Sequence, residues 1–335
     1  MSRDRHVVII GTGGTISSRY DPEKGRTVAS QDLEDLLALL PESTMLPRMT
    51  CVNFVVIPSF NMTLPLAWQL VQQAGRFLEQ PEVDGVVVTQ GTDTMEETSF
   101  LADILLDSKK PVVFTGAQLP HDHPQSDGPR NILDSVRAAA ADAAAELGSI
   151  VCFNGELHAA RDVTKVHTSA LETFQSYHHG ALGVVDGEKV VIHRRPTLRL
   201  HLRPAHLDKR VALIKLAMGT DARFLEATLG AGIDGLVVEA FGRGNVPAEF
   251  GKGLAQACRD GLPVVVTSRC PAGRVKPIYG GGGGGRDLED AGVLFAGDLK
   301  GPKARLLLTA ALADSSVADP SVNARLGELF RRIAP

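Results

Sequence analysis

Short runs of buried-type residues alternate with amphipathic segments along most of the chain, and this alternation predicts an α/β fold. In the first half, it predicts strands over residues 6–10, 52–57, 84–89, 111–115 and 149–153. Between them it predicts a polar loop over 17–29 and helices over 31–39, 65–79, 94–106 and 129–146. Since parallel strands need crossover helices, this order predicts a mainly parallel, doubly wound sheet with helices on both faces.

The pattern changes in the middle of the chain. Residues 182–185 and 189–192 flank Asp186-Gly187, which predicts a β-hairpin. Residues 193–210 are basic and rich in proline, without a helical or strand period, and are interpreted as an exposed linker. Behind it the alternation resumes, with strands near 211–216, 235–239, 263–267 and 292–295 and helices near 221–230, 247–260, 302–313 and 320–332. We therefore predict two domains, a larger N-terminal catalytic domain over 1–192 and a smaller C-terminal, flavodoxin-like parallel sheet over 211–335.

Small polar side chains follow the predicted strands where these strands end. In an open α/β sheet the carboxyl ends of the strands form the edge where ligands bind. Each turn by itself is explained equally well by local loop or capping chemistry. Their convergence on one edge predicts a site, built from Gly13-Gly14-Thr15, Pro58-Ser59, Gln90-Gly91-Thr92-Asp93, Thr115-Gly116-Ala117-Gln118 and Asn154-Gly155-Glu156.

The alternative from a different functional class is a Rossmann-type dinucleotide-binding protein or dehydrogenase. Its G-x-G-x-x-G fingerprint, begun at Gly11, needs a glycine at position 16, where this chain has Ile16. The fold would also need an acidic ribose ligand about 20 residues further on. A shift of the melting temperature by NAD would test this alternative.

Composition and charge narrow the choice of partners and location. The 335 residues are 44% hydrophobic and 22% charged, and the formal net charge is −4, so neither nucleic acid nor a membrane surface is an expected partner. The apolar run at 7–10 is too short for a signal peptide, which predicts a cytoplasmic protein. The four cysteines are widely spaced, and no His/Cys cluster has metal-ligand spacing.

Hydroxyl groups and one lysine form the candidate chemistry. A threonine hydroxyl needs an adjacent base to become a nucleophile, and a lysine can serve when its proton is held elsewhere. Lys165 lies in the polar stretch 161–169, although most lysines are only solvated surface charges. Together with Thr15, Thr92, Asp93 and Ser59, it suits acyl transfer on a small polar amide.

The same motifs resemble those of the bacterial-type L-asparaginases. T-G-G-T-I at 12–16 and G-T-D-T-M-E-E at 91–97 are similar to the two signature motifs of that family. The resemblance covers almost the whole chain, through Pro58-Ser59-Phe60-Asn61-Met62, Ser126-Asp127-Gly128-Pro129-x-Asn131, Gly155-x-x-x-x-x-Arg161-Asp162-Val163-Thr164-Lys165, Gly242-x-Gly244-Asn245 and Ser268-Arg269-x-Pro271-x-Gly273.

The resemblance implies L-asparagine hydrolysis through a covalent acyl-enzyme. It makes Thr15 the nucleophile, Thr92 a second catalytic hydroxyl coupled to Lys165, and Asp93 and Ser59 the holders of the substrate's α-amino and α-carboxylate groups. Which threonine attacks first stays open. It further implies a homotetramer of paired dimers, no cofactor or metal, and a substrate pocket that also includes Phe60, Ala117 and, from a neighbouring subunit, Asn245.

The chain departs from the family pattern at three places. Tyr20 is the only tyrosine near the first threonine and is therefore the candidate to activate it. Matching the downstream helix puts Arg26 at the position of the activating tyrosine, so Tyr20 can act only if the loop folds differently. Phe60 replaces a glutamine after the substrate-binding serine, which removes a side-chain donor. Tyr279 and the run Gly280–Gly285 stand where many members carry a glutamate. This run is either a lid or subunit-contact loop, or a surface insertion.

These departures leave alternatives beside L-asparagine hydrolysis. One is a related amidohydrolase acting on another small β- or γ-amide, and another is a non-catalytic amino-acid-binding relative. Glutaminase side activity is also undecided. The amide-hydrolysing subunit of a transamidation complex needs an additional N-terminal domain, for which a first motif at residue 11 leaves no room.

Overall fold

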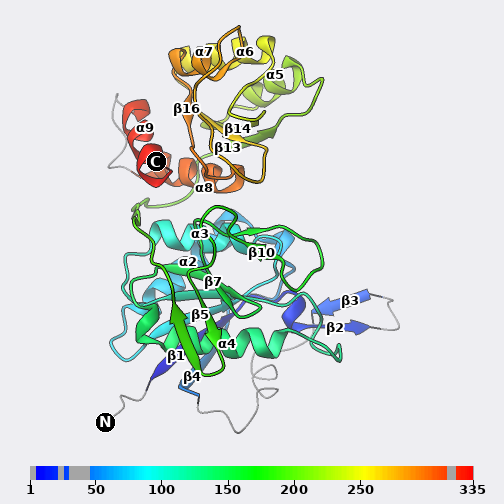
Figure 1. Ribbon diagram of the computed structural model, residues 1–335, viewed down its shortest axis with the longest axis vertical. Coiled ribbons are helices and arrows are strands. Elements are labelled where there is room, and N and C mark those ends of the chain that lie inside the picture. The colour runs from blue at the N-terminus through cyan, green and yellow to red at the C-terminus, as the bar shows by residue number, and fades with distance from the viewer. Residues whose placement is uncertain (1–4, 22–25, 30–45, 315–321, 335) are drawn as a thin grey trace. The chain divides into compact units, whose positions relative to one another are not determined.

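The computed structural model describes residues 5–21, 26–29, 46–314 and 322–334. The chain forms two compact units, residues 1–201 and 202–335, and each has its own β-sheet and hydrophobic core (Figure 1). The boundary between the units falls inside the stretch 193–210. Two α/β domains are therefore present, the N-terminal one the larger.

The larger unit is built on an eight-stranded sheet in the order β12-β11-β8-β7-β6-β5-β1-β4. Its five parallel strands are β1 (His6–Gly11), β4 (Arg48–Asn53), β5 (Gly85–Thr89), β6 (Val112–Thr115) and β7 (Ser149–Phe153). Three antiparallel strands extend one side, namely β8 (Glu156–Ala159), β11 (Gly183–Asp186) and β12 (Lys189–Ile192). The last two form the predicted hairpin.

Helices cover both faces of this sheet, as the sequence predicts. α2 (Leu64–Leu78) and α3 (Met95–Leu105) pack against each other on one face, and α4 (Gly128–Ala140) packs on the other (Figure 1). Val7 and Ile9 of β1 belong to the core beneath α4, together with Ile132 and Val136 of that helix. Strands buried on both faces read as continuous apolar runs, which explains why the sequence located them well.

The connections of the sheet change direction between β1 and β5. From β1 the chain moves to β4 on one side, and from β5 it moves to β6 and β7 on the other. Such a switch point opens a crevice at the carboxyl ends of the two central strands. Here those ends are Gly11 and Thr89, and each precedes a polar turn that the sequence singled out.

Three predicted elements of this unit were wrong in position. The strand expected at 52–57 is β4, which ends at Asn53 because its partner β1 ends at Gly11. The loop expected at 17–29 contains a hairpin of β2 (Ser18–Asp21) and β3 (Arg26–Ala29). The helix expected at 129–146 ends at Ala140, and a separate turn, η3 (Asp142–Ala144), follows. The helix expected at 31–39 lies outside the described residues.

The smaller unit has four parallel strands in chain order, β13 (Val211–Lys215), β14 (Gly235–Ala240), β15 (Val264–Ser268) and β16 (Leu294–Phe295). α8 (Gly301–Ala313) packs on β13, β14 and β15. α5 (Ala222–Gly230) packs on α6 (Ala248–Arg259), and α6 packs on α7 (Gly285–Asp290). α9 (Val322–Ile333) lies against β16. The sequence missed α7, which begins at the last glycine of the run 280–285.

That glycine run is packed against its neighbours. The Gly283 carbonyl accepts a hydrogen bond from the Val246 amide at 2.9 Å. A Cβ atom at Gly283 would lie 2.3 Å from the Val246 carbonyl oxygen, and one at Gly284 would lie 2.0 Å from the Tyr279 carbonyl oxygen. Glycine is therefore required at these two positions by close backbone contact, and the run is an ordered part of the fold.

The first half of the basic stretch 193–210 is bound to the larger unit. Arg199 donates hydrogen bonds to the carbonyls of Leu106 and Ser108, just beyond the end of α3. Arg195 donates to the carbonyls of Ala143 and Ala145. These arginines are not the free charges of an exposed linker, because they satisfy carbonyl groups at the ends of helical segments.

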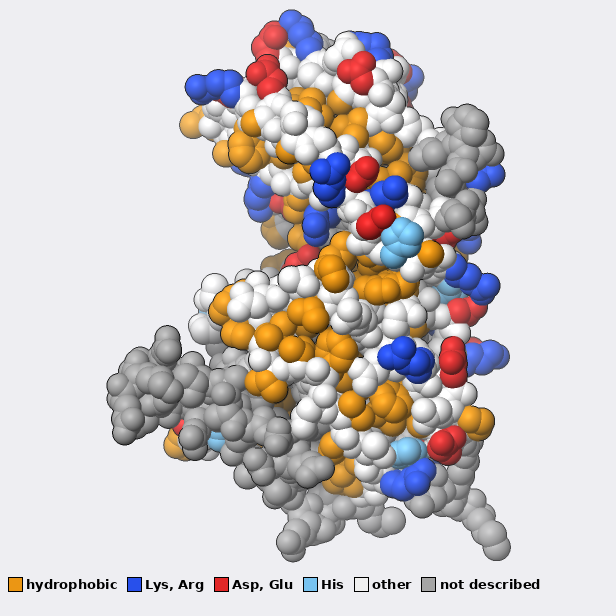
Figure 2. Space-filling view, turned by 180° about the vertical axis from the view of Figure 1, so that it is seen from behind, with side chains coloured by type: hydrophobic (Ala, Val, Ile, Leu, Met, Phe, Trp, Pro, Cys, Tyr) orange, Lys and Arg blue, Asp and Glu red, His pale blue; other side chains and the backbone are white. Residues whose placement is uncertain are grey.

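The surface carries charges of both signs. On the face that Figure 2 shows, lysine and arginine side chains lie among aspartate and glutamate side chains, and hydrophobic side chains gather in several separate groups. Within the described ranges, none of the helices has the length and apolar character that crossing a lipid bilayer requires.

Candidate functional site

The site begins where the turns after β1 and β5 touch. Gly13 and Gly14 have φ values of 87° and 91°, a region that favours glycine. A Cβ atom at Gly14 would lie 2.4 Å from the Gly91 amide nitrogen. This contact brings Thr15, which follows the first turn, and Thr92, which belongs to the second, to one crevice.

Lys165 lies at the centre of the charged part of the site. It belongs to β9 (Thr164–Lys165), which pairs with β10 (Phe174–Gln175). Its Nζ atom donates hydrogen bonds to Thr92 Oγ1 and to Asp93 Oδ1, both at 2.7 Å. The lysine side chain is 15% exposed and the aspartate side chain 53% exposed, so the ion pair reaches from the interior to solvent.

Ser59 is fixed to the turn after β5 by two hydrogen bonds. It opens the short turn η2 (Ser59–Asn61), and it is buried. Its Oγ atom accepts from the Asp93 amide at 3.2 Å, and its carbonyl accepts from Thr94 Oγ1 at 2.9 Å. Since the Oγ atom acts as an acceptor there, its own proton is left to donate to a ligand.

A cavity of about 360 Å³ joins these groups. Its lining residues come from the turns after β1, β4, β5 and β6 and from the segment that begins at Lys165, namely Gly14, Thr15, Pro58, Ser59, Phe60, Gly91, Thr92, Asp93, Gln118, Lys165 and Thr168. Six of the residues singled out from the sequence therefore meet in one cavity. Phe60 is 71% exposed at this cavity.

Three other predicted site residues lie elsewhere or stay untested. Ala117 is buried in the core of the larger unit, directly before Gln118. Asn245 belongs to the smaller unit, where its Oδ1 atom accepts from the Gly285 amide at 3.2 Å, at the start of α7. The backbone of Tyr20 lies in β2 and pairs with Thr27. Its role in activating Thr15 remains a prediction.

Gln118 and Thr168 also line the cavity, although the sequence analysis gave neither a role of its own. Gln118 belongs to the small polar turn after β6 that the sequence singled out, but only Ala117 of that turn was assigned to the substrate pocket. Thr168 carries no comparable signal, since it lies in a long connection whose path depends on the fold. A further contact, from Thr164 Oγ1 to the Glu96 carboxylate, joins the strand of Lys165 to α3.

The donor set suits nucleophilic chemistry more than metal binding. Hydroxyl groups, an ammonium and a carboxylate surround the cavity, which is the set that acyl transfer to a hydroxyl requires. In the part of the chain that the structure describes, no group of three or more His, Cys, Asp and Glu side chains is placed to hold a metal ion.

The sequence matches two family models that together span both units. The model described as "Asparaginase, N-terminal" matches residues 6–198, and that described as "Glutaminase/Asparaginase C-terminal domain" matches residues 210–321.

The chain is similar both to proteins named as L-asparaginases and to proteins named as subunits of a glutamyl-tRNA(Gln) amidotransferase. The L-asparaginase of Bacillus licheniformis is 32% identical over 318 residues, which cover 92% of this chain and 96% of the relative. A probable L-asparaginase of Deinococcus radiodurans is 37% identical over 309 residues, or 90% of this chain and 91% of the relative. A subunit of the glutamyl-tRNA(Gln) amidotransferase of Haloquadratum walsbyi is 35% identical over 347 residues, or 98% of this chain and 76% of the relative.

Proposed function

The chain belongs to the asparaginase family, and from that premise we propose that it hydrolyses L-asparagine to L-aspartate and ammonia. The observation that carries this proposal is the pair of 2.7 Å hydrogen bonds from Lys165 Nζ to Thr92 and Asp93, in a cavity that Thr15 also lines. A hydroxyl coupled to a lysine is an activated nucleophile once the lysine has lost a proton.

In the proposed reaction a threonine Oγ atom attacks the side-chain amide carbon. The O–C bond forms, the C–N bond breaks, and the amide nitrogen leaves as ammonia with the proton that the hydroxyl gave up. Water then hydrolyses the β-aspartyl ester and restores the hydroxyl. We assign the attack to Thr15 and the proton-relaying hydroxyl to Thr92, whose partner Lys165 is linked to solvent through the half-exposed Asp93.

The walls of the cavity supply groups for the charged ends of an amino acid. The carboxylate of Asp93 suits an α-ammonium group, and the Ser59 hydroxyl, whose oxygen already accepts from the Asp93 amide, suits an α-carboxylate. Phe60 offers an apolar surface beside them in place of a polar side chain. We expect this side chain to influence the choice between asparagine and glutamine.

Release of ammonia by the purified protein tests the proposal. L-asparagine, L-glutamine and D-asparagine are offered separately, with Thr92→Ala as the blank. We expect rapid release from L-asparagine and a loss of at least about two orders of magnitude in turnover for both Thr15→Ala and Thr92→Ala. Near-full activity of either variant would remove that threonine from its role, and silence of the wild type on all three amides would refute asparagine hydrolysis.

A second candidate follows from the amidotransferase relatives, which match this chain at similar identity. The same cavity would then release ammonia for a partner enzyme. We expect a protein of this kind to hydrolyse its amide strongly only when the partner and its acceptor are present. High turnover of free L-asparagine by the isolated chain distinguishes the two candidates in favour of the first. Two alternatives remain, hydrolysis of another small amide and binding without hydrolysis. In either case the wild-type protein would release no ammonia from the three amides tested.

We further infer a homotetramer of paired dimers and a cytoplasmic location. The resemblance of the motifs supports the assembly, and it assigns Asn245 of the smaller unit to the active site of a neighbouring copy. None of the four cysteines, all within the described residues, forms a disulfide, which supports a reducing compartment. Burial also raises the pKa of the Cys152 thiol to about 12 and that of the Cys258 thiol to about 11, which disfavours the reactive thiolate. One relative, from Haemophilus influenzae, is named as periplasmic, so fractionation of cells is the direct measurement.

A further inference from the structure

Gln118 lies on the turn after β6, and hydrogen bonds from the start of α4 hold this turn in place. The Asp127 carboxylate accepts hydrogen bonds from the Gln118 amide at 3.0 and 3.1 Å and from the Leu119 amide at 3.0 Å. Asn131, which is buried, donates from Nδ2 to the Gly116 carbonyl and to Asp127, both at 3.0 Å. The backbone is therefore fixed at Gln118 itself and at the residues before and after Ala117-Gln118, through the Gly116 carbonyl and the Leu119 amide.

The hydrogen bonds of the Gln118 side chain allow one orientation of its amide group. The Ala170 carbonyl can only accept, so the atom 3.1 Å from it is the donor Nε2. The acceptor Oε1 then faces Thr92 Oγ1 at 3.4 Å. Lys165 Nζ, as an ammonium, can only donate to the same hydroxyl oxygen. The proton of Thr92 is consequently directed to Gln118, and a lone pair of its oxygen is directed to Lys165.

We propose that Gln118 is a positioning residue for the proposed hydrolysis. It orients the Thr92 hydroxyl while Lys165 is an ammonium, and it ties the segment that carries Lys165 to the turns after β5 and β6. This inference rests on the proposed function for its kinetic consequence. Its structural half, the tie to Ala170, does not depend on turnover.

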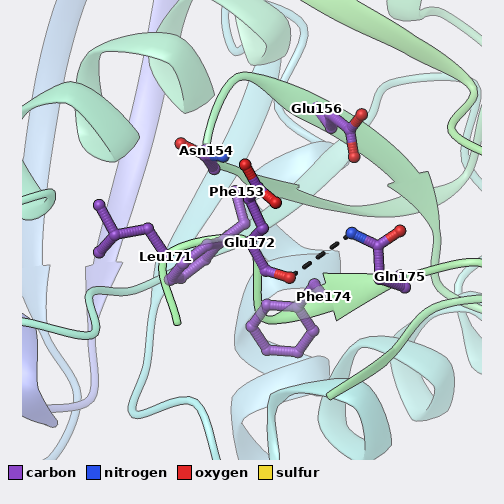
Figure 3. A pocket seen from close by; sticks show the side chains of 7 residues that line it. All are labelled: Phe153, Asn154, Glu156, Leu171, Glu172, Phe174 and Gln175. Atoms are coloured by element: carbon purple, nitrogen blue, oxygen red, sulfur yellow. Dashed lines mark hydrogen bonds between the residues drawn. The ribbon is translucent and has the colours of Figure 1, made fainter. Parts of the chain in front are cut away.

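The segment behind Lys165 needs such a tie because a second cavity lies against it. This cavity of about 270 Å³ is lined from the segment by Leu171, Glu172, Phe174 and Gln175, and from the end of β7 and the start of β8 by Phe153, Asn154 and Glu156. Figure 3 shows these side chains around it, with Gln175 bonded to the Glu172 carbonyl within the segment itself. Side chains that border a cavity have fewer packing contacts to resist a shift than side chains packed on all sides.

Much of the hydrogen bonding of this segment is internal. His167 Nδ1 accepts from the amides of Ser169 and Ala170, and the Val166 amide donates to the Thr173 carbonyl at 2.7 Å. The loop therefore holds its own shape, whereas the Gln118 bond to Ala170 connects its tip to the fixed turn after β6. The base of the loop is held by Thr164 Oγ1, which donates to the Glu96 carboxylate of α3, so loss of the Gln118 bond frees the tip and loosens the contact of Lys165 with Thr92.

Three substitutions separate the parts of the proposal. Gln118→Met keeps the length of the side chain and removes both hydrogen bonds. Gln118→Glu keeps an acceptor for Thr92, removes the donor for Ala170 and adds a negative charge beside the ammonium of Lys165. Gln175→Met is the matched control, since it makes the same exchange at the second cavity, on the neighbouring strand.

We expect Gln118→Met to lower kcat roughly tenfold and to change KM by less than about threefold, because the interaction positions the reacting groups more than it holds substrate. Gln118→Glu is expected to move the acidic limb of the kcat/KM profile to higher pH by about one unit, because its charge favours the protonated ammonium. Gln175→Met is expected to match the wild type in both. The positioning role is overturned if kcat of Gln118→Met lies within about twofold of that of Gln175→Met and the acidic limb of the kcat/KM profile of Gln118→Glu stays at the wild-type pH.

Hydrogen exchange measured by mass spectrometry tests the tie without turnover. Peptides covering residues 164–175 should exchange at least about fivefold faster in Gln118→Met than in the wild type or in Gln175→Met, because the segment opens more often. Unchanged exchange there overturns the tie. A wild type that releases no ammonia while these peptides respond refutes the proposed function and leaves the tie standing. If Gln118→Met fails to fold, the same exchange and pH measurements on Gln118→Glu decide.

Discussion

At the scale of single residues, the proposed chemistry depends on Lys165. Its ammonium donates to a hydroxyl oxygen and to a carboxylate oxygen, and 15% of its side chain is exposed. Because Asp93 is half exposed, its ion pair with Lys165 is open to solvent on one side. Ion pairs in contact with solvent contribute about 1 kcal/mol or less to stability. We therefore expect the arrangement to serve proton transfer more than stability.

Replacing Lys165 by methionine should separate these two roles. Without the lysine nitrogen, Thr92 loses the group that accepts its proton once Lys165 is neutral, and we expect kcat to fall by at least about two orders of magnitude. Thermal unfolding should change little, because methionine fills a similar volume. The matched control is Lys189→Met on the exposed strand β12, which should keep full activity. A Lys165→Met protein that is unfolded instead would assign the lysine a structural role.

His6 gives a prediction for pH, far from the reacting groups. Arg48 can only donate, so His6 Nδ1 accepts from its Nη2 at 2.9 Å, and Nε2 donates to Thr50 Oγ1 at 2.8 Å. This pattern requires a neutral ring. Burial, together with the positive charge of Arg48, lowers the pKa of His6 below its ordinary value of about 6.5.

Below about pH 6.5 the unfolded chain binds a proton at His6 that the folded chain does not. The free energy of unfolding therefore decreases as the pH is lowered through this window. We expect Tm to drop by about 1–2 °C more between pH 7 and 5.5 in the wild type than in His6→Gln. Glutamine can accept from Arg48 and donate to Thr50 without titrating. Equal pH slopes for the two proteins, measured by differential scanning calorimetry, would contradict this account.

At the scale of elements, close contacts between glycine-rich turns determine where side chains can reach. The Gly14 contact with Gly91 brings two strand ends together, and the run 280–285 packs against the residues before α6. In both cases backbone touches backbone, so a methyl group has no space. Such positions are read from the sequence as flexible, although the fold uses them as rigid contacts.

The glycine run offers a matched pair that tests this view. Gly284→Ala places a Cβ atom 2.0 Å from the Tyr279 carbonyl oxygen, whereas Gly280→Ala places one 3.4 Å from Asp287 Oδ1, an ordinary contact. We expect the first change to lower the free energy of unfolding by about 3 kcal/mol and the second to alter it by less than about 0.5 kcal/mol. Chemical denaturation followed by circular dichroism measures both. Equal values would mean that the run is a mobile insertion.

At the scale of the whole molecule, the two units divide the predicted site. Thr15, Thr92 and Lys165 belong to the larger unit, and Asn245 belongs to the smaller one. If copies of the chain exchange Asn245, as the resemblance implies, an active site needs residues of two chains. Assembly would then be a requirement for activity as well as for stability.

Mixing two inactive variants tests this sharing. In a hybrid of Thr92→Ala and Asn245→Ala chains, one site has both substitutions and the other has neither. Random pairing should therefore restore roughly a quarter of the wild-type activity, because half of the pairs are hybrids with one intact site. Coexpression provides the mixture, and separation on two affinity tags isolates the hybrids, for which roughly half of the wild-type activity is expected because one of their two sites is intact. Activity no higher than the sum of the two variants would place Asn245 in its own chain's site, or outside any site.

The sequence by itself determined the alternation of strands and helices, the two α/β units and six of the residues that line the cavity. It could do so because buried parallel strands are continuous apolar runs, and because short motifs encode the turns at strand ends. The residues of the proposed chemistry, Thr15, Thr92, Asp93 and Lys165, were all named from the sequence.

Only the tertiary structure decided what depends on contacts between distant segments. β4 ends where its partner β1 ends, and the antiparallel strand β8 and the short pair of β9 and β10 have too few residues for a periodic signal. The amide of Gln118 is oriented by Ala170, 52 residues further along the chain, and by Thr92, 26 residues before it. No local pattern carries such information, because a hydrogen-bond partner is chosen by the packing of the whole unit.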